Sequence, residues 1–225
     1  MNKYRLTEET KVVAGVTLHR IQALKSFGDV TKGDLGGWVA SEDNLSQEGL
    51  CWVSGKACVS EDAKVFGNAK VSGNAQVFGD AWVFGDAKVY ENARVYKNAQ
   101  VSVNACVFGY ARVFGDAWVY GDAKVSRNAW VYGDAEVSGY ARVFGDACVF
   151  GDARVFGNVR VYGDVRVYGD AWVSGNAWVF EKTKVYGDAW VYGDAKVSGN
   201  AWVSGYAEVF GDAWMSEGVI TSGEH

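Results

Sequence analysis

From Val53 onwards the apolar and polar positions follow a six-residue pattern: valine, then Phe, Tyr or Ser, then glycine, Asp or Asn, alanine and a variable residue. The valine position runs to Met215 without an insertion, and 27 of its 28 residues are valine. Because six is a multiple of two, the alanine and the valine of each repeat project to the same side of a β-strand. In an α-helix these positions would drift by about 120° per repeat. The pattern therefore predicts short strands whose alanines and valines face a common core.

The glycine and the Asp or Asn that follows it predict a corner, because glycine adopts positive φ freely and Asn and Asp tolerate it best among other residues. This turn chemistry explains the corner aspartates without a cation site. One hexapeptide is too short to enclose a core, so three are expected per turn. An 18-residue step also produces an aromatic column: Phe78, Tyr96, Phe114, Tyr132, Phe150, Tyr168 and Tyr186. The sequence thus predicts an all-β fold, a single-stranded parallel β-helix of about nine triangular coils.

The first 50 residues lack the repeat and are predicted to form an N-terminal cap, followed by the β-helix over residues 51–225. Apolar residues recur at every third position in one part of the cap: Leu18, Ile21, Leu24 and Phe27. This spacing predicts a short amphipathic helix over Thr17–Phe27 that ends at Gly28. Solenoid ends expose unpaired strand edges and need such a cover. The Asp34–Val39 segment is predicted to form a first, irregular coil.

The hexapeptide resembles that of the LpxA-like superfamily of left-handed β-helices. The combination of Thr17–Phe27, Gly33–Val39, Asn44–Ser46 and the Val-x-Gly-Asn/Asp-Ala array is similar to the YdcK-like branch. That branch includes many uncharacterised bacterial and phage-encoded proteins, so the resemblance is compatible with a phage origin. It covers nearly the whole chain and implies a left-handed coil. One departure is that many superfamily enzymes place glycine directly after the aliphatic residue, whereas here Phe, Tyr or Ser intervenes.

The same superfamily includes CoA-dependent acyltransferases, so acyl transfer is one hypothesis. Those enzymes generally use a histidine as general base. Here the histidines are His19 in the cap and His225 at the end of the sequence, and the array has none. No loop is inserted between coils to build a pocket. The sequence therefore favours a protein without catalytic residues or a cofactor, and the acyltransferase alternative stays open.

The cysteines give no sign of a disulfide or a metal site. Cys51, Cys58, Cys106 and Cys148 include no pair separated by one coil of three hexapeptides, so none faces another across neighbouring coils. No CxxC motif or Cys/His cluster suggests zinc. Reduced thiols and a cytoplasmic location are expected. The sequence also lacks an apolar run long enough for a membrane helix and an apolar core typical of a signal peptide, so no membrane association is expected.

The residues that precede each valine carry the candidate binding chemistry. Nine tryptophans, from Trp52 to Trp214, are predicted to point outward. So much exposed aromatic surface exceeds what monomers usually tolerate, which predicts a homo-oligomer or a protein partner. The candidate binding residues are Trp172, Trp178, Trp190 and Trp202, of which Trp172 and Trp190 are expected to stack, together with Arg142, Arg154, Arg160 and Arg166.

The four arginines are predicted to form a basic band that attracts phosphate groups. The chain nevertheless has 22 basic and 27 acidic residues, a net charge of −5, and the aspartates at adjacent corners are expected to neutralise the band. Nucleic-acid binding is therefore not expected. Three hypotheses remain: a non-catalytic scaffold or binding protein that self-associates, a CoA-dependent acyltransferase, and an aromatic-face binder of glycans or small anionic metabolites.

Overall fold

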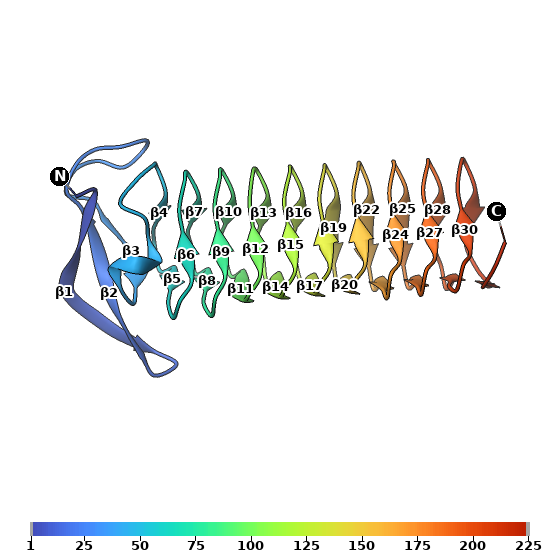
Figure 1. Ribbon diagram of the computed structural model, residues 1–225, viewed down its shortest axis with the longest axis horizontal. Coiled ribbons are helices and arrows are strands. Elements are labelled where there is room, and N and C mark those ends of the chain that lie inside the picture. The colour runs from blue at the N-terminus through green and yellow to red at the C-terminus, as the bar shows by residue number, and fades with distance from the viewer. Residues whose placement is uncertain (1, 224–225) are drawn as a thin grey trace.

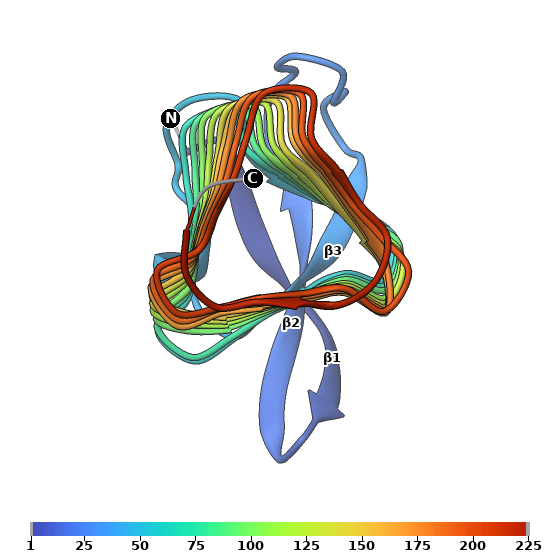
Figure 2. The same ribbon diagram turned by 90° about the vertical axis from the view of Figure 1, so that its right-hand side faces the viewer.

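The computed structural model describes residues 2–223. The chain forms a long three-sided solenoid with a β-hairpin at its N-terminal end (Figure 1). Viewed along the axis, the coils superimpose as a triangle, and the hairpin extends beyond one side of it (Figure 2). Each side of the triangle is one parallel sheet, extended by the antiparallel cap strands in one case.

The three sheets have thirteen, ten and nine strands. In spatial order, the thirteen-stranded sheet contains β1 (Tyr4–Val13), β2 (Val16–Ala23), β3 (Leu35–Val39), β5 (Cys58–Val59), β8 (Gln76–Val77), β11 (Arg94–Lys97), β14 (Arg112–Gly115), β17 (Trp130–Gly133), β20 (Cys148–Gly151), β23 (Arg166–Tyr168), β26 (Lys184–Tyr186), β29 (Trp202–Val203) and β32 (Val219–Ile220). The ten-stranded sheet contains β4 (Trp52–Val53), β7 (Lys70–Val71), β10 (Lys88–Val89), β13 (Cys106–Val107), β16 (Lys124–Val125), β19 (Arg142–Gly145), β22 (Arg160–Gly163), β25 (Trp178–Glu181), β28 (Lys196–Val197) and β31 (Trp214–Met215). The nine-stranded sheet contains β6 (Lys64–Val65), β9 (Trp82–Val83), β12 (Gln100–Val101), β15 (Trp118–Val119), β18 (Glu136–Val137), β21 (Arg154–Val155), β24 (Trp172–Val173), β27 (Trp190–Val191) and β30 (Glu208–Val209).

The predicted coil of three hexapeptides is confirmed by the strand register. Val113 pairs with Val131, and Val131 with Val149, so that each valine lies beside its counterpart one coil away. Val131 and Ala129 are fully buried, as are the other residues at the inward alanine and valine positions up to Val209. The core is therefore a stack of small apolar side chains along the axis, as the period-two argument requires.

The solenoid has about ten turns, compared with the prediction of about nine. The additional turn is the irregular first coil. In that coil β3 pairs with β5 through Val39 and Val59, and Leu45 bridges to Val65. Both steps are slightly longer than three hexapeptides, which makes this coil irregular. The prediction that Asp34–Val39 forms a first, irregular coil is confirmed.

The predicted cap helix is wrong. Residues 16–23 form β2, which pairs in antiparallel fashion with β1 on one side and β3 on the other. Leu18 and Ile21 are both buried although they are three residues apart, because the β2–β3 register shifts between Arg20 and Gln22. A bulge of this kind imitates helical spacing. Residues 2–223 contain no α-helix, and their helical turn is the three-residue 3-10 segment η1 (Glu42–Asn44).

Candidate functional site

The aromatic residues that follow the valines form stacked columns along the solenoid. Phe114 and Tyr132 have ring centroids 4.8 Å apart and planes 1° apart. The same contact continues without a break along the predicted column from Phe78 to Tyr186, which confirms that prediction. These rings are half-buried. Much of the aromatic surface is therefore used within the chain, where it stabilises the sheets.

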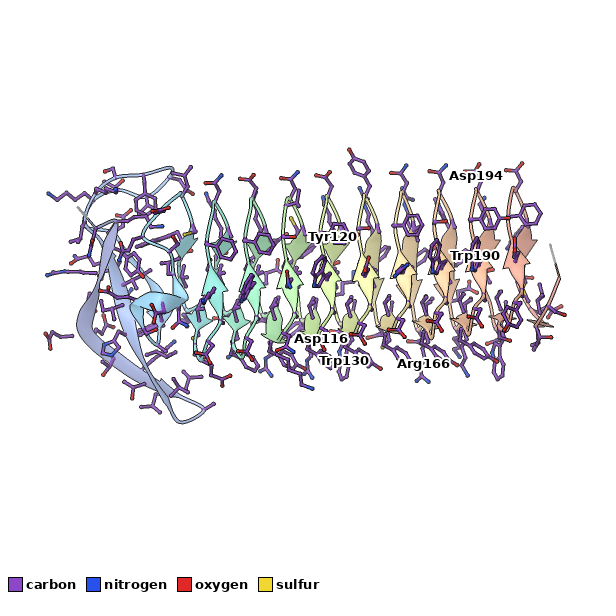
Figure 3. All side chains as sticks on the ribbon, in the orientation of Figure 1. Asp116, Tyr120, Trp130, Arg166, Trp190 and Asp194 are labelled. Carbon is purple, nitrogen blue, oxygen red and sulfur yellow. The ribbon has the colours of Figure 1, made fainter. Side chains whose placement is uncertain are left out.

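Trp172 and Trp190 stack as predicted, with centroids 5.1 Å apart and planes 6° apart. The Arg154 guanidinium covers Trp172 at 5.4 Å from the ring centroid. The two indoles line a shallow groove of about 300 Å³ on the nine-stranded sheet, where Trp190 is labelled in Figure 3. Because the two rings stack on each other, the faces between them are covered. This arrangement opposes a glycan that would stack on those indole faces.

The other two candidate tryptophans lie on different sides of the prism. Trp178, on the ten-stranded sheet, has the Arg160 guanidinium 4.5 Å and the Lys196 ammonium 5.9 Å from its ring centroid. Trp202, on the thirteen-stranded sheet, has the Lys184 ammonium at 4.1 Å. Cation–π contacts therefore recur on all three sheets, and the four candidate tryptophans do not form one site.

Trp52 is the exception to the expectation that the nine outward tryptophans are exposed. Its side chain is only 6% exposed. The rings of Tyr4 and Phe27 contact it edge-on, at centroid distances of 6.3 Å and 5.4 Å. The cap covers this outward position, a tertiary contact that the repeat pattern does not contain.

The four arginines of the predicted band are divided among the three sheets. Arg142 and Arg160 are neighbours in the ten-stranded sheet, Arg154 lies in the nine-stranded sheet, and Arg166 lies in the thirteen-stranded sheet. Within residues 2–223 no salt bridge joins any of the four to a corner aspartate. The expected neutralisation of the band by nearby aspartates therefore involves no direct ion pair among these residues and stays a prediction.

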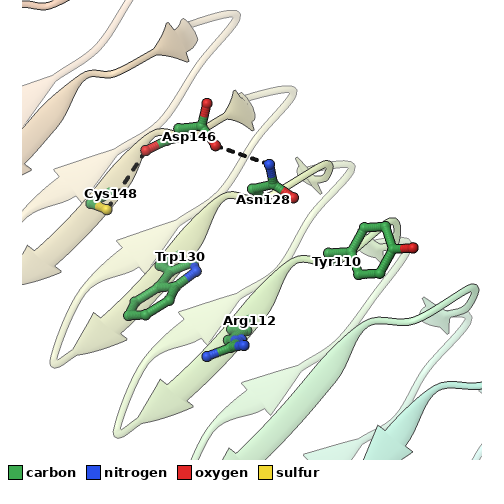
Figure 4. A pocket seen from close by; sticks show the side chains of 6 residues that line it. All are labelled: Tyr110, Arg112, Asn128, Trp130, Asp146 and Cys148. Carbon is green, nitrogen blue, oxygen red and sulfur yellow. Dashed lines mark hydrogen bonds between the residues drawn. The ribbon is translucent and has the colours of Figure 1, made fainter.

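The corner carboxylates instead accept hydrogen bonds from asparagines. Asn128 donates from Nδ2 to Oδ1 of Asp146 at 2.9 Å, one coil further along (Figure 4). Asn98 and Asp116 make the same contact at another corner, at 2.8 Å. These bridges support the view that Asp and Asn serve the turns and the stacking of coils.

The structure brings together a pair of arginines that the sequence analysis did not select. Arg94 and Arg112 are register neighbours on the thirteen-stranded sheet. Arg112 also lies 4.9 Å above the Trp130 ring, in a groove of about 500 Å³ that Figure 4 shows. This pair is found by comparing the outward residues of successive coils. The predicted band was instead chosen because its four arginines lie close together in the sequence.

The groups required for acyl transfer do not gather around a pocket in the described part of the chain. His19 is in the cap, where its Nδ1 lies 3.4 Å from the carbonyl oxygen of Thr7. His225 is outside the described residues. The four cysteines are free in the structure, and burial raises the pKa of the Cys148 thiol, which disfavours the thiolate.

Residues 2–223 contain neither a metal-ligand cluster nor a helix that could span a membrane. No group of three or more His, Cys, Asp or Glu side chains is arranged to hold a metal ion. None of the helical segments described is long and apolar enough to cross a membrane.

Comparison with known proteins gives a family match for one part of the array. Residues 153–169 and 159–175 match the family described as YdcK Beta solenoid repeat, and the two matches are offset by one hexapeptide. The chain is also similar to the protein named "Uncharacterized acetyltransferase YdcK" from Escherichia coli strain K12, with 41% identity over 61 residues. That similarity covers 24% of this chain and 19% of the relative. The YdcK β-solenoid repeat therefore matches residues 153–175 of this solenoid.

Proposed function

We propose that the protein is a non-catalytic scaffold, two copies of which associate through the outward face of the nine-stranded sheet. The observation that carries this proposal is the self-complementary order of the outward side chains on that face. In chain order they are Lys64, Trp82, Gln100, Trp118, Glu136, Arg154, Trp172, Trp190 and Glu208. The four free cysteines support a reducing, cytoplasmic setting for this scaffold.

The tryptophans of this face offer apolar area to a partner. Trp82, Trp118 and Trp190 are 42%, 47% and 43% exposed. Consecutive outward positions are separated by one coil, about 4.8 Å, so the face is a regular row of side chains. Partly exposed tryptophans on a flat surface are typical of the centre of protein interfaces.

A two-fold axis through the middle of the row would bring complementary groups together. With two copies running in opposite directions, Lys64 faces Glu208 and Trp82 faces Trp190. Trp118 then faces Arg154, the pairing of an indole with a guanidinium that the chain already makes within itself. A C2 interface of this kind uses the same patch on both copies.

Glu136 is the exception, since it faces its own copy at the axis. Its Oε2 accepts a hydrogen bond from the Tyr120 hydroxyl at 3.4 Å. Two carboxylates at the axis repel each other and weaken the association. Glu136→Gln is therefore expected to strengthen it.

Sedimentation equilibrium over a range of concentrations tests the proposal. The wild type is expected to dimerise, and Trp118→Ser to weaken the dimer by about tenfold or more, because central tryptophans dominate interfaces. Trp130→Ser is the matched control: Trp130 is 38% exposed but lies on the thirteen-stranded sheet. A wild type that stays monomeric, or equal weakening by both substitutions, would contradict the proposal.

Acyl transfer is the second candidate function, and the name of the E. coli relative is what favours it. Against it stands the array, which has no histidine to act as general base. Calorimetric titration with acetyl-CoA separates the two functions. We expect no binding heat. A tight acetyl-CoA complex would favour the transferase, and loss of turnover in His19→Ala would then place its base in the cap.

A further inference from the structure

A second groove lies on the thirteen-stranded sheet, beside the corner that joins it to the ten-stranded sheet. Its volume is about 240 Å³. Six side chains line it: Asn74, Gln76, Asn92, Arg94, Tyr110 and Arg112. All six can donate hydrogen bonds, and none is a carboxylate.

Arg94 and Arg112 give this groove a concentrated positive charge. They occupy the same outward position on neighbouring coils, so their backbones are one strand spacing apart, about 4.8 Å. The positive charges of both arginines affect Tyr96. Burial raises the pKa of the Tyr96 hydroxyl, and the charges of Arg112 and Arg94 oppose that rise. Within residues 2–223 neither arginine forms a salt bridge. Two guanidinium groups on neighbouring coils without a carboxylate partner repel each other, and an anion bound between them would relieve that repulsion.

The adjoining corner differs from the other two corners in its charge. Its corner column reads Lys56, Asn74, Asn92, Tyr110 and Asn128 before the first aspartate, Asp146. At the opposite corner of the same sheet the column begins with Asp62 and Asp80 and includes Asp116. The aspartates that elsewhere border the faces are therefore missing next to the arginine pair.

One carboxylate, that of Glu91, is adjacent to Asn92 in the sequence, but it acts on the other side of the corner. There, burial, Cys106 and Glu91 together raise the pKa of Tyr90, which directly follows β10 of the ten-stranded sheet. Glu91 is not among the residues that line the groove. The arginines thus keep their charge without a neighbouring acid in the groove.

Tyr110 interrupts the hydrogen-bonded ladder of the corner and leaves a donor for a ligand. Asn74 donates to Oδ1 of Asn92 at 3.1 Å, and Asn128 donates to Asp146. Between them Tyr110 stands where Asp or Asn is usual, and its ring points away from the corner (Figure 4). Within residues 2–223 the Nδ2 of Asn92 has no hydrogen-bond acceptor. Asn92 therefore adds a neutral donor beside the two guanidiniums.

The other in-register arginine pair lacks these features. Arg142 and Arg160 also occupy neighbouring coils. There, however, Asn158 donates to Asn176 at 3.1 Å. Asp122 precedes this pair at its corner. A free amide donor and a carboxylate-free border distinguish the Arg94–Arg112 groove.

We propose that the groove formed by Arg94, Arg112 and Asn92 binds the tetrahedral oxyanion of a phosphate group, as in a phosphate monoester. Two guanidiniums and an amide supply donors to several phosphate oxygens at once, and arginine suits this geometry. This site is on a different face from the dimer interface, so it does not depend on the proposed function.

Titration with inorganic phosphate and with methyl phosphate, followed by ³¹P NMR at constant ionic strength, tests the site. Acetate is the competing planar anion. Both phosphates are expected to bind, and acetate to displace them poorly. The titration with methyl phosphate shows whether the groove accepts a phosphate that carries a substituent. Binding of inorganic phosphate alone would overturn the assignment of a phosphate monoester.

Two substitutions copy residues that the chain already has at equivalent positions. They distinguish binding at this site from a general effect of net charge. Arg94→Gln copies the outward Gln76 one coil earlier, and Asn92→Asp copies the usual corner residue. Each is expected to weaken phosphate binding by about tenfold or more, the usual effect of losing a charge-assisted hydrogen bond. Arg154→Gln is the matched control, because it removes the same charge from a position next to Glu136.

Unchanged phosphate binding in Arg154→Gln and in Trp118→Ser, with loss in the two groove variants, supports the site. No phosphate binding by the wild type overturns it. Equal weakening by Arg154→Gln and Arg94→Gln also overturns it, because binding would then follow net charge alone.

Discussion

A Cβ placed on Gly115 would stand 2.9 Å from the backbone nitrogen of Gly133, the glycine one coil further along. Gly115 has a φ of 78°, in the left-handed region. The glycine position of the repeat is held at six other places by a residue with a side chain, and each of these also has a positive φ: Glu61, Glu91, Lys97, Val103, Arg127 and Glu181. None of them has another of the six one coil away. The corners therefore accept a side chain only where the adjacent coil offers glycine.

Gly115→Ala is expected to destabilise the solenoid by about 1–3 kcal/mol, because it adds a Cβ to a strained conformation. It also places an alanine beside Lys97, which occupies the same position one coil earlier. Gly211→Ala is the control: Gly211 has a φ of 62°, but no atom lies within 4 Å of its Cβ position. Urea unfolding should show the larger loss for Gly115→Ala. Equal losses would mean that the approach of the coils does not matter.

Val131→Asp is expected to prevent soluble expression. Val131 is fully buried between Val113 and Val149, so an aspartate there would place a carboxylate in the core without a partner. Lys124→Asp puts the same side chain at an exposed outward position and should be soluble. Recovery of both proteins in the soluble fraction, with similar melting temperatures, would refute the inward assignment of the valines.

Tyr4 makes the cap sensitive to alkaline pH. Its buried hydroxyl donates to the carbonyl oxygens of Leu45 at 2.6 Å and Glu42 at 3.1 Å. Burial first, and then the nearby Glu42, Cys51 and Asp43, raise the pKa of Tyr4 far above its ordinary value. The folded state therefore holds the proton more tightly than the unfolded state does.

The stability that Tyr4 contributes is complete below the pKa of an unfolded tyrosine, about 10, and decreases as the pH rises above it. Tyr4→Phe is expected to cost about 1–3 kcal/mol at neutral pH, since two carbonyl groups lose their donor. Between about pH 8 and pH 11 the wild type should lose more stability than Tyr4→Phe. Parallel losses in urea unfolding at the two pH values would exclude Tyr4 as the group responsible.

The sequence predicted the array well because one geometric rule repeats 28 times. The inward valines, the register of one coil and the Trp172–Trp190 stack all follow from that rule. The cap follows no repeat, and the β2–β3 register shift gave Leu18 and Ile21 a helical spacing. The covering of Trp52 by Tyr4 and Phe27 likewise depends on contacts between distant segments. The left-handed sense of the coil stays a prediction from the family resemblance.

The candidate sites were harder to predict because neighbours in space are a whole coil apart in the sequence. Arginines that are dense along the chain, such as Arg154, Arg160 and Arg166, lie on three different sheets. Arg94 and Arg112 are separated by two intervening strands of the other sheets and yet are adjacent. Comparing the outward residues and the corner residues of successive coils would have revealed the arginine pair and the absence of carboxylates beside it. It would not have revealed the unpaired amide of Asn92.

Chemical cross-linking at Glu136 tests most directly that two copies meet through the nine-stranded sheet. Glu136→Cys, in a background with Cys106→Ser and Cys148→Ser, puts equivalent thiols on opposite sides of the two-fold axis. Packed sheets lie about 10 Å apart, too far for a disulfide, so the probe is a short bismaleimide. The account predicts a covalent dimer for Glu136→Cys. Gln100→Cys, whose two copies would be four coils or about 19 Å apart along the axis, should stay monomeric. Equal cross-linking of both variants, or none at Glu136→Cys, would contradict the interface.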